Sequence, residues 1–491
     1  MHILVLLALA CGLFAACGGA DVGRPKANAA LGLGDLSNLA QVSELHPAAF
    51  VLLHEPGLEV QLSALHPAGA LFENFGASRE SALGAHLRFR KVLTNLGIQT
   101  ATVREVLLVV EQEKLIEAAM GVLKFELADS GDVGQKERSL VSDDYKKKVL
   151  QTLSKNELVD VLVGRPTITL QKSAVNTPLV TLATKFNPVG NLVFTRDQQI
   201  TTAKGVVLGH LNSPQREAET LIAKLCWEEL GVPLVGDVRS SGGGRLEGGD
   251  FIPINADVCY IGIGLRTNIE AVEYMMKHDL FGTTRVAVVR DEFDKNQDRM
   301  HLDTVFNVID SKRVIALEDI LGKESPKRRL VDVYVKGAEQ SYSKGTSGVE
   351  FSEFLKEEGW TVVTVTNEQQ LNYMINFVNL GRGSPHGFIL SVHPDLGLKL
   401  KGAGYQGHVE YVDYRGVTTM YGAAHCTTQV LRMSPADFQN IKFSYMTPTM
   451  LYDARGTLVH GIAAVGAVAL AAVGIRHSRV HRMLFAVHGG S

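Results

Sequence analysis

The sequence is poor in cysteine, with five in a chain of 491 residues. Cys11 and Cys17 lie near the N-terminus, and no CxxC pair occurs. This spacing argues against a disulfide framework and against a cysteine-ligated zinc site. The three other cysteines, Cys226, Cys259 and Cys426, are compatible with small buried apolar residues or with a single reactive thiol.

The chain also lacks an excess of charge of one sign. Its 49 basic and 52 acidic residues give a formal net charge of -3, which is not the basic bias of nucleic-acid-binding proteins. A GxxxxGK[ST] phosphate loop is absent, and the glycine-rich stretch 240–244 lacks the GxGxxG order. We therefore predict neither a nucleic-acid partner nor a nucleotide cradle.

Neither of the two long apolar runs is long enough to cross a membrane as a helix. Ile3 to Ala16 is similar to the apolar core of a secretory signal, although only the amino terminus and His2 precede it as basic groups. A non-functional extension is the alternative. The run from Gly461 to Ile475 predicts a surface-packed helix, with a membrane-touching tail as the alternative. No stable membrane span is predicted.

Short β-branched runs alternate with helical patterns, which indicates the α/β class without revealing how the strands close. Residues 104–163 have helical spacing and many charges, and Ser154 to Glu157 is a capping-box pattern, so we predict a helical insertion there. Strands are predicted at 49–53, 191–195, 258–263, 285–289, 305–310, 331–335, 361–366 and 388–391, and helices at 79–96, 215–230, 268–278 and 368–377.

Four short segments place an acid, a histidine or a cysteine beside a predicted strand end. They are Asn191–Asp197, Leu246–Asp250, His301–Phe306 and His425–Thr427. Each alone is weak evidence, because an aspartate after a strand is usually a turn residue and a buried thiol is ordinary. Together they supply a nucleophile, an acid/base group and several carboxylates.

This set of side chains suits attack on a guanidinium group. A thiol such as Cys426 needs a neighbouring base or positive charge to become a thiolate, and a histidine can fill that role. A planar guanidinium presents five N–H donors, for which the carboxylates of Asp197, Glu247 and Asp303 are natural acceptors. On a strand, His301 and Asp303 would point to the same side.

In this order the four segments resemble those of the arginine deiminases, guanidine-modifying enzymes of the pentein, or α/β-propeller, fold. The likeness runs from about residue 50 to about residue 432, and the helical insertion fits it. The resemblance implies a pseudo-fivefold α/β propeller with an inserted helical domain. The implied division is a signal-like segment and linker at 1–48, a catalytic domain at 49–103 and 164–432, the insertion at 104–163, and an extension of unknown role at 433–491.

Carried onto this sequence, the resemblance implies a role for each motif residue. Cys426 is the nucleophile, and His301 is the general acid/base. Asp197 and Asp303 hold the guanidinium nitrogens, and Glu247 assists His301. The remaining substrate-binding positions are Asn191, Arg216 and Arg266, which match positions for the α-carboxylate and backbone of the substrate, and Phe194, which lines the pocket.

The sequence departs from the family pattern at three positions near the motif residues. Met420 and Tyr421 stand where family members commonly have Gly-Arg, so one carboxylate-binding arginine is missing. Gln198 replaces the usual proline after the first aspartate. These departures bear on substrate affinity and loop closure more than on the chemistry.

The resemblance implies hydrolysis of L-arginine to L-citrulline and ammonia through a covalent thiouronium intermediate, with no metal or organic cofactor. Two alternatives stay open: a sister hydrolase for agmatine or dimethylarginine, and a non-catalytic binding protein of the same fold. Arg216 and Arg266 argue against agmatine, which has no carboxylate. The family implies a cytoplasmic enzyme, whereas the N-terminal segment favours secretion; a homo-oligomer is compatible with these observations.

Overall fold

A computed structural model describes residues 26–65, 78–128, 133–175, 177–338, 341–382 and 386–444. The chain divides into two compact units, Met1–Met433 and Ser434–Ser491. In the second unit the described part is helix α16, Pro435–Ser444. Both apolar runs singled out in the sequence, Ile3 to Ala16 and Gly461 to Ile475, lie outside the described residues.

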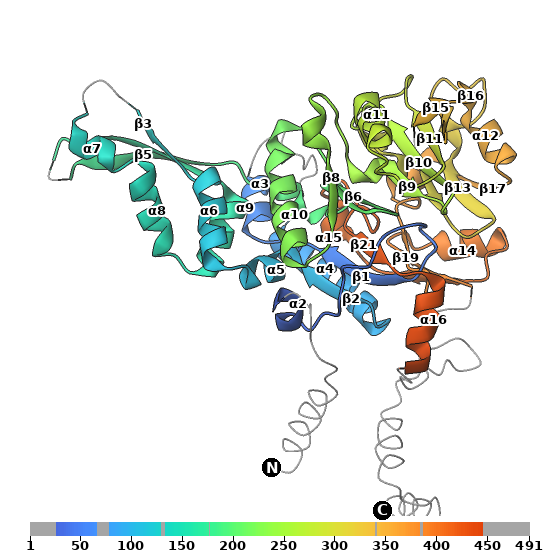
Figure 1. Cartoon of the computed structure of the whole chain (residues 1–491), viewed down its shortest axis with the longest axis horizontal. Helices are drawn as coiled ribbons and strands as arrows, with labels where there is room; N and C mark the ends of the chain where they lie inside the picture. Colours follow the sequence, from blue (N-terminus) through green and yellow to red (C-terminus); the bar gives the residue numbers. More distant parts are fainter. Residues whose placement is uncertain are drawn as a thin grey trace, which may run out of the picture. The chain divides into compact units, whose positions relative to one another are not determined.

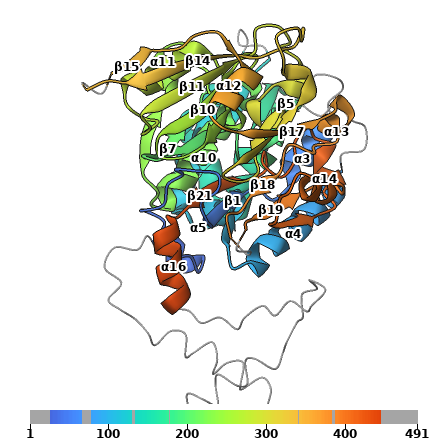
Figure 2. The same ribbon diagram turned by 90° about the vertical axis from the view of Figure 1, so that its right-hand side faces the viewer.

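The described strands of the first unit form six separate sheets, and five of these repeat one pattern (Figures 1 and 2). A central strand has an antiparallel partner on one side and, on the other, a parallel partner that follows it in the chain. The sixth sheet also has a central strand with one antiparallel and one parallel partner, but there the parallel partner precedes it in the chain. The sheets are β21–β1–β2 (Gln429–Arg432, Ala48–Leu53, Gln99–Thr102), β6–β7–β8 (Gln199–Thr202, Gly205–Leu208, Leu234–Asp237), β9–β10–β11 (Phe251–Pro253, Val258–Ile263, Arg285–Arg290), β12–β13–β17 (Phe306–Val308, Arg313–Leu317, Thr361–Val365) and β18–β19–β20 (Val378–Asn379, Phe388–Ser391, His408–Tyr411).

Helices connect each central strand to its parallel neighbour, as a parallel pair requires. Helix α11 shows why they form: Asn268 caps its first turn, and Ala271, Val272, Met275 and Met276 share its buried face. The connecting helices are α3 and α4 (Leu58–Ala64, Arg79–Asn95), α10 (Glu217–Glu229), α11 (Ile269–Lys277), α12 (Phe351–Glu357) and α14 (Leu396–Gly402). The prediction of an α/β class is therefore confirmed.

The remaining elements extend or connect these repeats. Strand β14 (Leu330–Lys336) adds to β11 and pairs with both β15 (Tyr342–Lys344) and β16 (Val349–Glu350). The other helices in this part of the chain are α2 (Lys26–Ala30), α13 (Asn367–Leu371) and α15 (Arg415–Thr418).

The segment after β2 is mostly helical and also contains a strand. Ser154 and Glu157 form the predicted capping box at the start of α9. The helices are α5 (Val103–Val109), α6 (Gln112–Val122), α7 (Gln135–Ser139), α8 (Asp143–Gln151) and α9 (Lys155–Gly164), and the sixth sheet is β3–β4–β5 (Lys124–Leu127, Pro166–Lys172, Leu179–Phe186). The sheet thus joins residues on both sides of position 164.

Two secondary-structure predictions, at residues 191–195 and 368–377, are wrong. Asn191 to Thr195 is a 3-10 turn at Gly190–Val193 and an irregular stretch, although its side chains favour a strand. The helix predicted over 368–377 ends at Leu371, and Tyr373 has a φ of 63°, which breaks the helical path. In both places tertiary contacts override local propensity.

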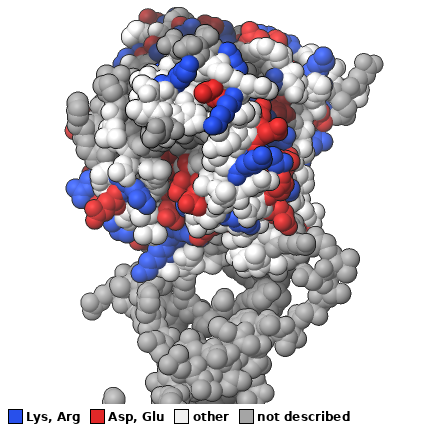
Figure 3. Space-filling view, turned by 90° about the vertical axis from the view of Figure 1, so that its left-hand side faces the viewer, with Lys and Arg blue, Asp and Glu red and all other residues white. Residues whose placement is uncertain are grey.

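The described surface mixes charges of both signs. On the face in Figure 3, basic and acidic side chains are interspersed, in keeping with the balanced composition. Among the described helices, none combines the length and apolar character needed to cross a membrane.

Candidate active site

The four sequence segments converge on one pocket in the first unit. Asn191, Phe194 and Asp197 come from the turn before β6, and Cys426 from the turn before β21. Glu247 and Asp303 lie behind the pocket wall, in contact with its residues. The lining residues are Asn191, Phe194, Asp197, Arg216, Arg266, Gln297, Met300, His301, Thr304, Tyr421 and Cys426.

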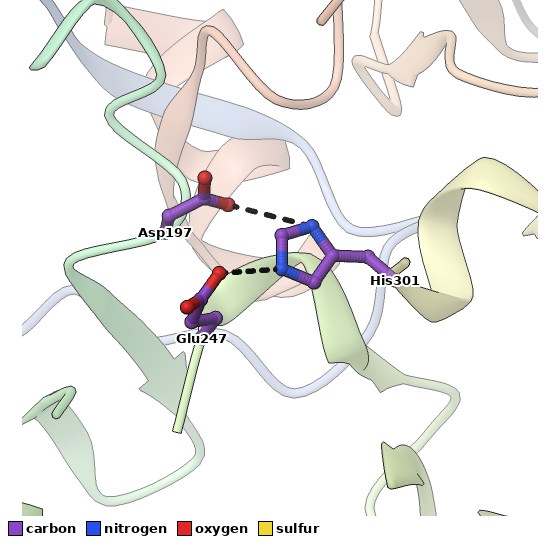
Figure 4. Close-up of side chains that lie close together, drawn as sticks. All are labelled: Asp197, Glu247 and His301. Carbon is purple, nitrogen blue, oxygen red and sulfur yellow. Dashed lines mark hydrogen bonds and ion pairs between the residues drawn. The ribbon is translucent and has the colours of Figure 1, made fainter. Parts of the chain in front are cut away.

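His301 is held between two buried carboxylates. Its Nε2 donates to Glu247 Oε2 at 2.8 Å, and its Nδ1 lies 3.9 Å from Asp197 Oδ1 (Figure 4). Burial alone would lower the pKa of His301, but the charges of Asp197 and Glu247 outweigh it and raise the pKa to about 9. The surroundings of His301 therefore favour its protonated form at neutral pH.

The double glycine of the Leu246–Asp250 segment makes room for this imidazole ring. A Cβ atom at Gly249 would lie 2.6 Å from His301 Nδ1, closer than any side chain permits. Both carboxylate oxygens of Glu247 are held, because Oε2 accepts from His301 and Oε1 accepts a hydrogen bond from the Asn212 backbone at 2.9 Å. Burial opposes ionisation of Glu247, yet the His301 hydrogen bond and charge lower its pKa to about 2.

Cys426 faces the pocket with its sulfur close to a carboxylate. Its Sγ lies 3.7 Å from Asp303 Oδ2, and its backbone N–H donates to Asn376 Oδ1 at 3.3 Å. Burial, followed by the charges of Asp303 and Asp197, raises the pKa of the thiol well above its ordinary value. Its surroundings therefore favour the protonated thiol.

The sequence predicted Asp303 on a strand, but it lies in the 3-10 turn Leu302–Thr304, because the chain turns directly after His301. Its Oδ2 accepts a hydrogen bond from His425 Nδ1 at 2.8 Å. The other oxygen, Oδ1, and Oδ1 of Asp197 are both buried without a hydrogen-bond partner among the described residues. These two acceptors are available to the N–H groups of a ligand.

The two predicted arginines differ in their surroundings. Arg216 Nη1 donates to Asp197 Oδ2 at 2.9 Å, and its Nη2 donates to Glu219 Oε2 at 2.8 Å. Arg266 donates to Gln297 Oε1 at 3.0 Å, while its buried Nε has no hydrogen-bond partner in the described part of the chain. In this state Arg216 orients Asp197, and Arg266 retains a donor for a ligand.

Asp197, Glu247 and His301 also deserve comparison with a metal site, because their ligand atoms lie within 4.8 Å of one another. Arg216 Nη1 lies 2.9 Å from Asp197 and 3.9 Å from Glu247, so a positive charge already occupies this position. A second cation there would be repelled. The donor set fits a metal poorly, and the prediction of a metal-free site stays a prediction.

The two other described cysteines lie in hydrophobic cores. Cys226 packs beside Trp227 in the core under α10, and Cys259 lies in β10. Burial raises the pKa of Cys226, and it raises that of Cys259 to about 12. Both remain protonated thiols at neutral pH, which agrees with their interpretation as small buried residues.

Two of the residues that depart from the family pattern, Gln198 and Tyr421, have defined contacts or conformations at the site. Gln198 Nε2 donates to Glu219 Oε2 at 2.8 Å and so extends the Asp197–Arg216–Glu219 network. Tyr421 lines the pocket with a φ of 71°, a backbone region that favours glycine. A Cβ on the next residue, Gly422, would collide with the Phe194 ring at 2.2 Å, so this loop packs tightly against the pocket wall.

A family model described as arginine deiminase matches residues 71–432, most of the chain and all four segments. The chain belongs to the arginine deiminase family. Its assignment from sequence as an arginine deiminase, an amidine hydrolase, is therefore confirmed.

Individual members of the family are moderately similar to this chain. An arginine deiminase of Streptococcus uberis is 29% identical over 356 residues, which cover 67% of this chain and 82% of the relative. An arginine deiminase of Halobacterium salinarum is 27% identical over 323 residues, which cover 50% and 65%. One from Streptococcus pyogenes is 30% identical over 302 residues, which cover 57% and 70%.

Solved structures are also similar at low identity. A dimethylarginine dimethylaminohydrolase adduct aligns with a TM-score of 0.43 and 13% identity, covering 78% of this chain and 99% of that one. The N-terminal domain of ArgZ, a cyanobacterial arginine dihydrolase, aligns with a TM-score of 0.45 and 14% identity, covering 78% and 97%.

Within this family member, sequence reasoning missed several residues that support the site. Asn376 holds the Cys426 backbone but stands in no motif, inside a predicted helix. Glu219 could have been suspected, since it follows Arg216 by three positions near a helix start. Glu44, whose side chain lies 3.5 Å from His425 Nε2, carries no local signal.

Proposed function

We propose that this protein hydrolyses free L-arginine to L-citrulline and ammonia with Cys426 as the nucleophile. One observation carries the proposal: Cys426, His301, Asp197 and Arg266 line one pocket. Asp197, and Asp303 directly behind Cys426, each keep an unpaired acceptor that matches a guanidinium, and Arg266 retains a donor. The guanidinium would donate to Asp197 Oδ1 and Asp303 Oδ1, and the substrate carboxylate would meet Arg266.

The charge of the substrate prepares the nucleophile. Asp303 and Asp197 hold the Cys426 thiol protonated in the free site. A guanidinium placed between these carboxylates neutralises them and stabilises the thiolate, whose proton is released to solvent as the substrate binds. Ionisation is thereby coupled to the presence of substrate, which protects the free enzyme from adventitious alkylation.

The first half of the reaction releases ammonia. The Cys426 thiolate forms a C–S bond to the guanidinium carbon, and the electron pair of one C–N bond leaves with the nitrogen. His301 donates its proton to that nitrogen, so ammonia departs and an S-alkylthiouronium remains. Glu247 stabilises protonated His301 before the transfer through its 2.8 Å hydrogen bond.

The second half releases citrulline. His301, now neutral, accepts a proton from a water molecule that attacks the thiouronium carbon. The C–S bond then breaks and the sulfur leaves as thiolate. The hydroxyl proton passes to this sulfur, which restores the Cys426 thiol, and the C–O bond becomes the ureido carbonyl of citrulline. His301 regains its starting proton in this half, so the His301 imidazole serves as the acid in the first half and as the base in the second.

A sister substrate is the second candidate. Arg266 favours a substrate with a carboxylate, which disfavours agmatine, because its buried Nε would otherwise stay unpaired. Dimethylarginine keeps the carboxylate but adds methyl groups to one guanidinium nitrogen, which then loses its N–H donors to a carboxylate. The site therefore fits unmethylated arginine best.

Citrulline formation from arginine, with agmatine and dimethylarginine measured in parallel, tests the function. Wild-type protein should turn over arginine, Cys426→Ala should have no activity, and Cys226→Ala should stay near wild type as the matched cysteine control. An active Cys426→Ala enzyme would overturn the assignment of the nucleophile. Binding without turnover by the wild type would favour a binding protein of the same fold.

We also propose that the five repeated sheets surround a pseudo-fivefold axis, with the inserted domain between β2 and the turn before β6. The support is the common strand pattern of the five sheets and the helices α5 to α9. The proposed boundaries remain 49–103 and 164–432 for the catalytic domain, with 104–163 as the insertion. The pairing of β3 with β4 suggests that the inserted unit continues to Phe186.

A further inference from the structure

A buried carboxylate lies behind the active site, across His425 from Asp303. His425 Nδ1 donates to Asp303 Oδ2 at 2.8 Å, and its opposite nitrogen, Nε2, lies 3.5 Å from Glu44 Oε1. The three side chains are each at most 1% exposed, and neither Glu44 nor His425 lines the substrate pocket. Glu44 and His425 therefore do not touch substrate directly.

Glu44 is held as a charged group by several cations. Arg432 Nη2 donates to Glu44 Oε2 at 2.6 Å, and Arg196 Nη1 lies 3.7 Å from Oε1. Gln41 Nε2 donates to Oε1 at 2.8 Å. Burial alone would raise the pKa of Glu44, but Arg432 and His425 lower it far below its ordinary value.

The segment that contributes Glu44 is tied to several parts of the first unit. Ala40 N donates to Arg432 O, Gln41 N donates to Thr202 O, and Glu44 N donates to Pro253 O. These backbone bonds reach β21, β6 and β9. Glu44 thus has a fixed position, although its segment reads as a linker in the sequence.

We propose that Glu44 and His425 form a positioning relay that fixes the orientation of Asp303 for substrate binding. This inference rests on the proposed function. A carboxylate can rotate about its terminal bond, so one oxygen must be held if the other is to face the substrate. The His425 hydrogen bond holds Asp303 Oδ2 and leaves Oδ1 unpaired. The Glu44 carboxylate lies 3.5 Å from the other ring nitrogen, Nε2, which has no hydrogen-bond partner among the described residues, so Glu44 acts on the ring through its charge.

The charges around His425 support this division of roles. Asp303 and Glu44 are the carboxylates at its two ring nitrogens. Arg196 donates to the His425 backbone oxygen at 3.2 Å, and Arg432 contacts Glu44. Removing the Glu44 charge leaves these arginines near a histidine with a single anionic partner, which weakens the fixed orientation of the ring.

Glu44→Gln tests the relay by separating substrate binding from folding. Loss of one interaction with a charged group typically costs about tenfold or more, and the loss transmitted through His425 cannot exceed that of removing the ring. We therefore expect kcat/KM for arginine to fall by up to about tenfold, with KM raised. Glu59→Gln is the matched control, because Glu59 is equally buried and pairs with another histidine, His54, at 3.0 Å outside the pocket. It should change kcat/KM less than about threefold at a similar loss of melting temperature.

A double-mutant cycle identifies the route. If Glu44 acts through His425, Glu44→Gln should change kcat/KM less than about twofold in a His425→Asn background. Equal effects of Glu44→Gln with and without His425 would overturn the relay, as would an effect no larger than that of Glu59→Gln. Should Glu44→Gln fail to fold, Gln41→Ala keeps both charges and should raise KM in the same direction; an unchanged KM contradicts the relay.

Failure of the relay and failure of the proposed function give different results. If wild-type protein forms no citrulline, the proposed function fails, and arginine affinity measured by calorimetry replaces KM in every comparison. If wild-type protein is active and Glu44→Gln matches it, the relay alone fails.

Discussion

His301 lines the same pocket as Cys426, His425 directly precedes Cys426 in the chain, and the surroundings of the two histidines are alike in several respects. Both are at most 3% exposed, and each ring lies within 4.0 Å of two carboxylates, one at each nitrogen. They differ in access, because His301 lines the pocket and His425 does not. Burial and charged partners therefore do not identify an acid/base residue; contact with the space where substrate reacts does.

The sharpest way to break this comparison is to remove each imidazole. His301→Ala should lower kcat by about 10²–10⁴-fold, the usual contribution of general acid/base catalysis. His425→Asn should lower kcat/KM by only about tenfold, because it disturbs the orientation of Asp303 rather than proton transfer. Steady-state citrulline assays decide the point; a larger loss in His425→Asn than in His301→Ala would exchange the two roles.

The two arginines offer a second comparison, at the other end of the substrate. Arg266→Ala should raise KM for arginine by about 100-fold, since a buried charge loses its partner, and should leave agmatine turnover nearly unchanged. Arg216→Ala should impair both substrates, because Asp197 loses the 2.9 Å bond that orients it. Parallel kinetics with both substrates measure the difference, and the same arginine-to-agmatine ratio in both variants would contradict it.

The raised pKa of His301, about 9, predicts how the rate depends on pH. Ammonia release needs protonated His301, so the single-turnover rate should fall about tenfold per pH unit above about 9. The same proton stabilises the fold: its contribution is complete below the ordinary value of 6.5 and is lost as pH rises through about 9. A rate that still increases at pH 10 would show that the proton comes from elsewhere.

The smallest expected effect is that of metal removal. Arg216 already supplies positive charge beside Asp197 and Glu247, so dialysis against a chelator should leave kcat and KM unchanged. Metal analysis of the purified protein provides the control. Lost activity that Zn²⁺ or Mn²⁺ restores would show that Asp197, Glu247 and His301 hold a cation after all.

Sequence motifs located the residues that the structure brings together at the pocket, because each motif stands beside a strand end with a chemically distinctive neighbour. They did not reveal Asn376 or Glu44, since a lone amide or carboxylate without a pattern is indistinguishable from a surface residue. The stretch Asn191 to Thr195 misled for a physical reason: Leu192, Val193 and Phe194 favour strands, yet they are buried in hydrophobic cores at and directly after a 3-10 turn, and Phe194 also lines the pocket. The role expected for Arg216 depended on its match to a family position, whereas its ion pairs with Glu219 and Asp197 determine where its guanidinium points.

The pairing of β1 with β21 has a consequence for biosynthesis. Strand β1 leaves the ribosome early, but its antiparallel partner and the adjacent nucleophile emerge among the last residues of the first unit. The Glu44–Arg432 bond spans 388 positions, a sequence separation that slows folding. A chain released before residue 426 would lack the reactive thiol and expose the unpaired edge of β1, whose six residues are all buried in the finished fold. Such an edge invites aggregation, so truncated products should be recovered as insoluble protein rather than as slow enzymes.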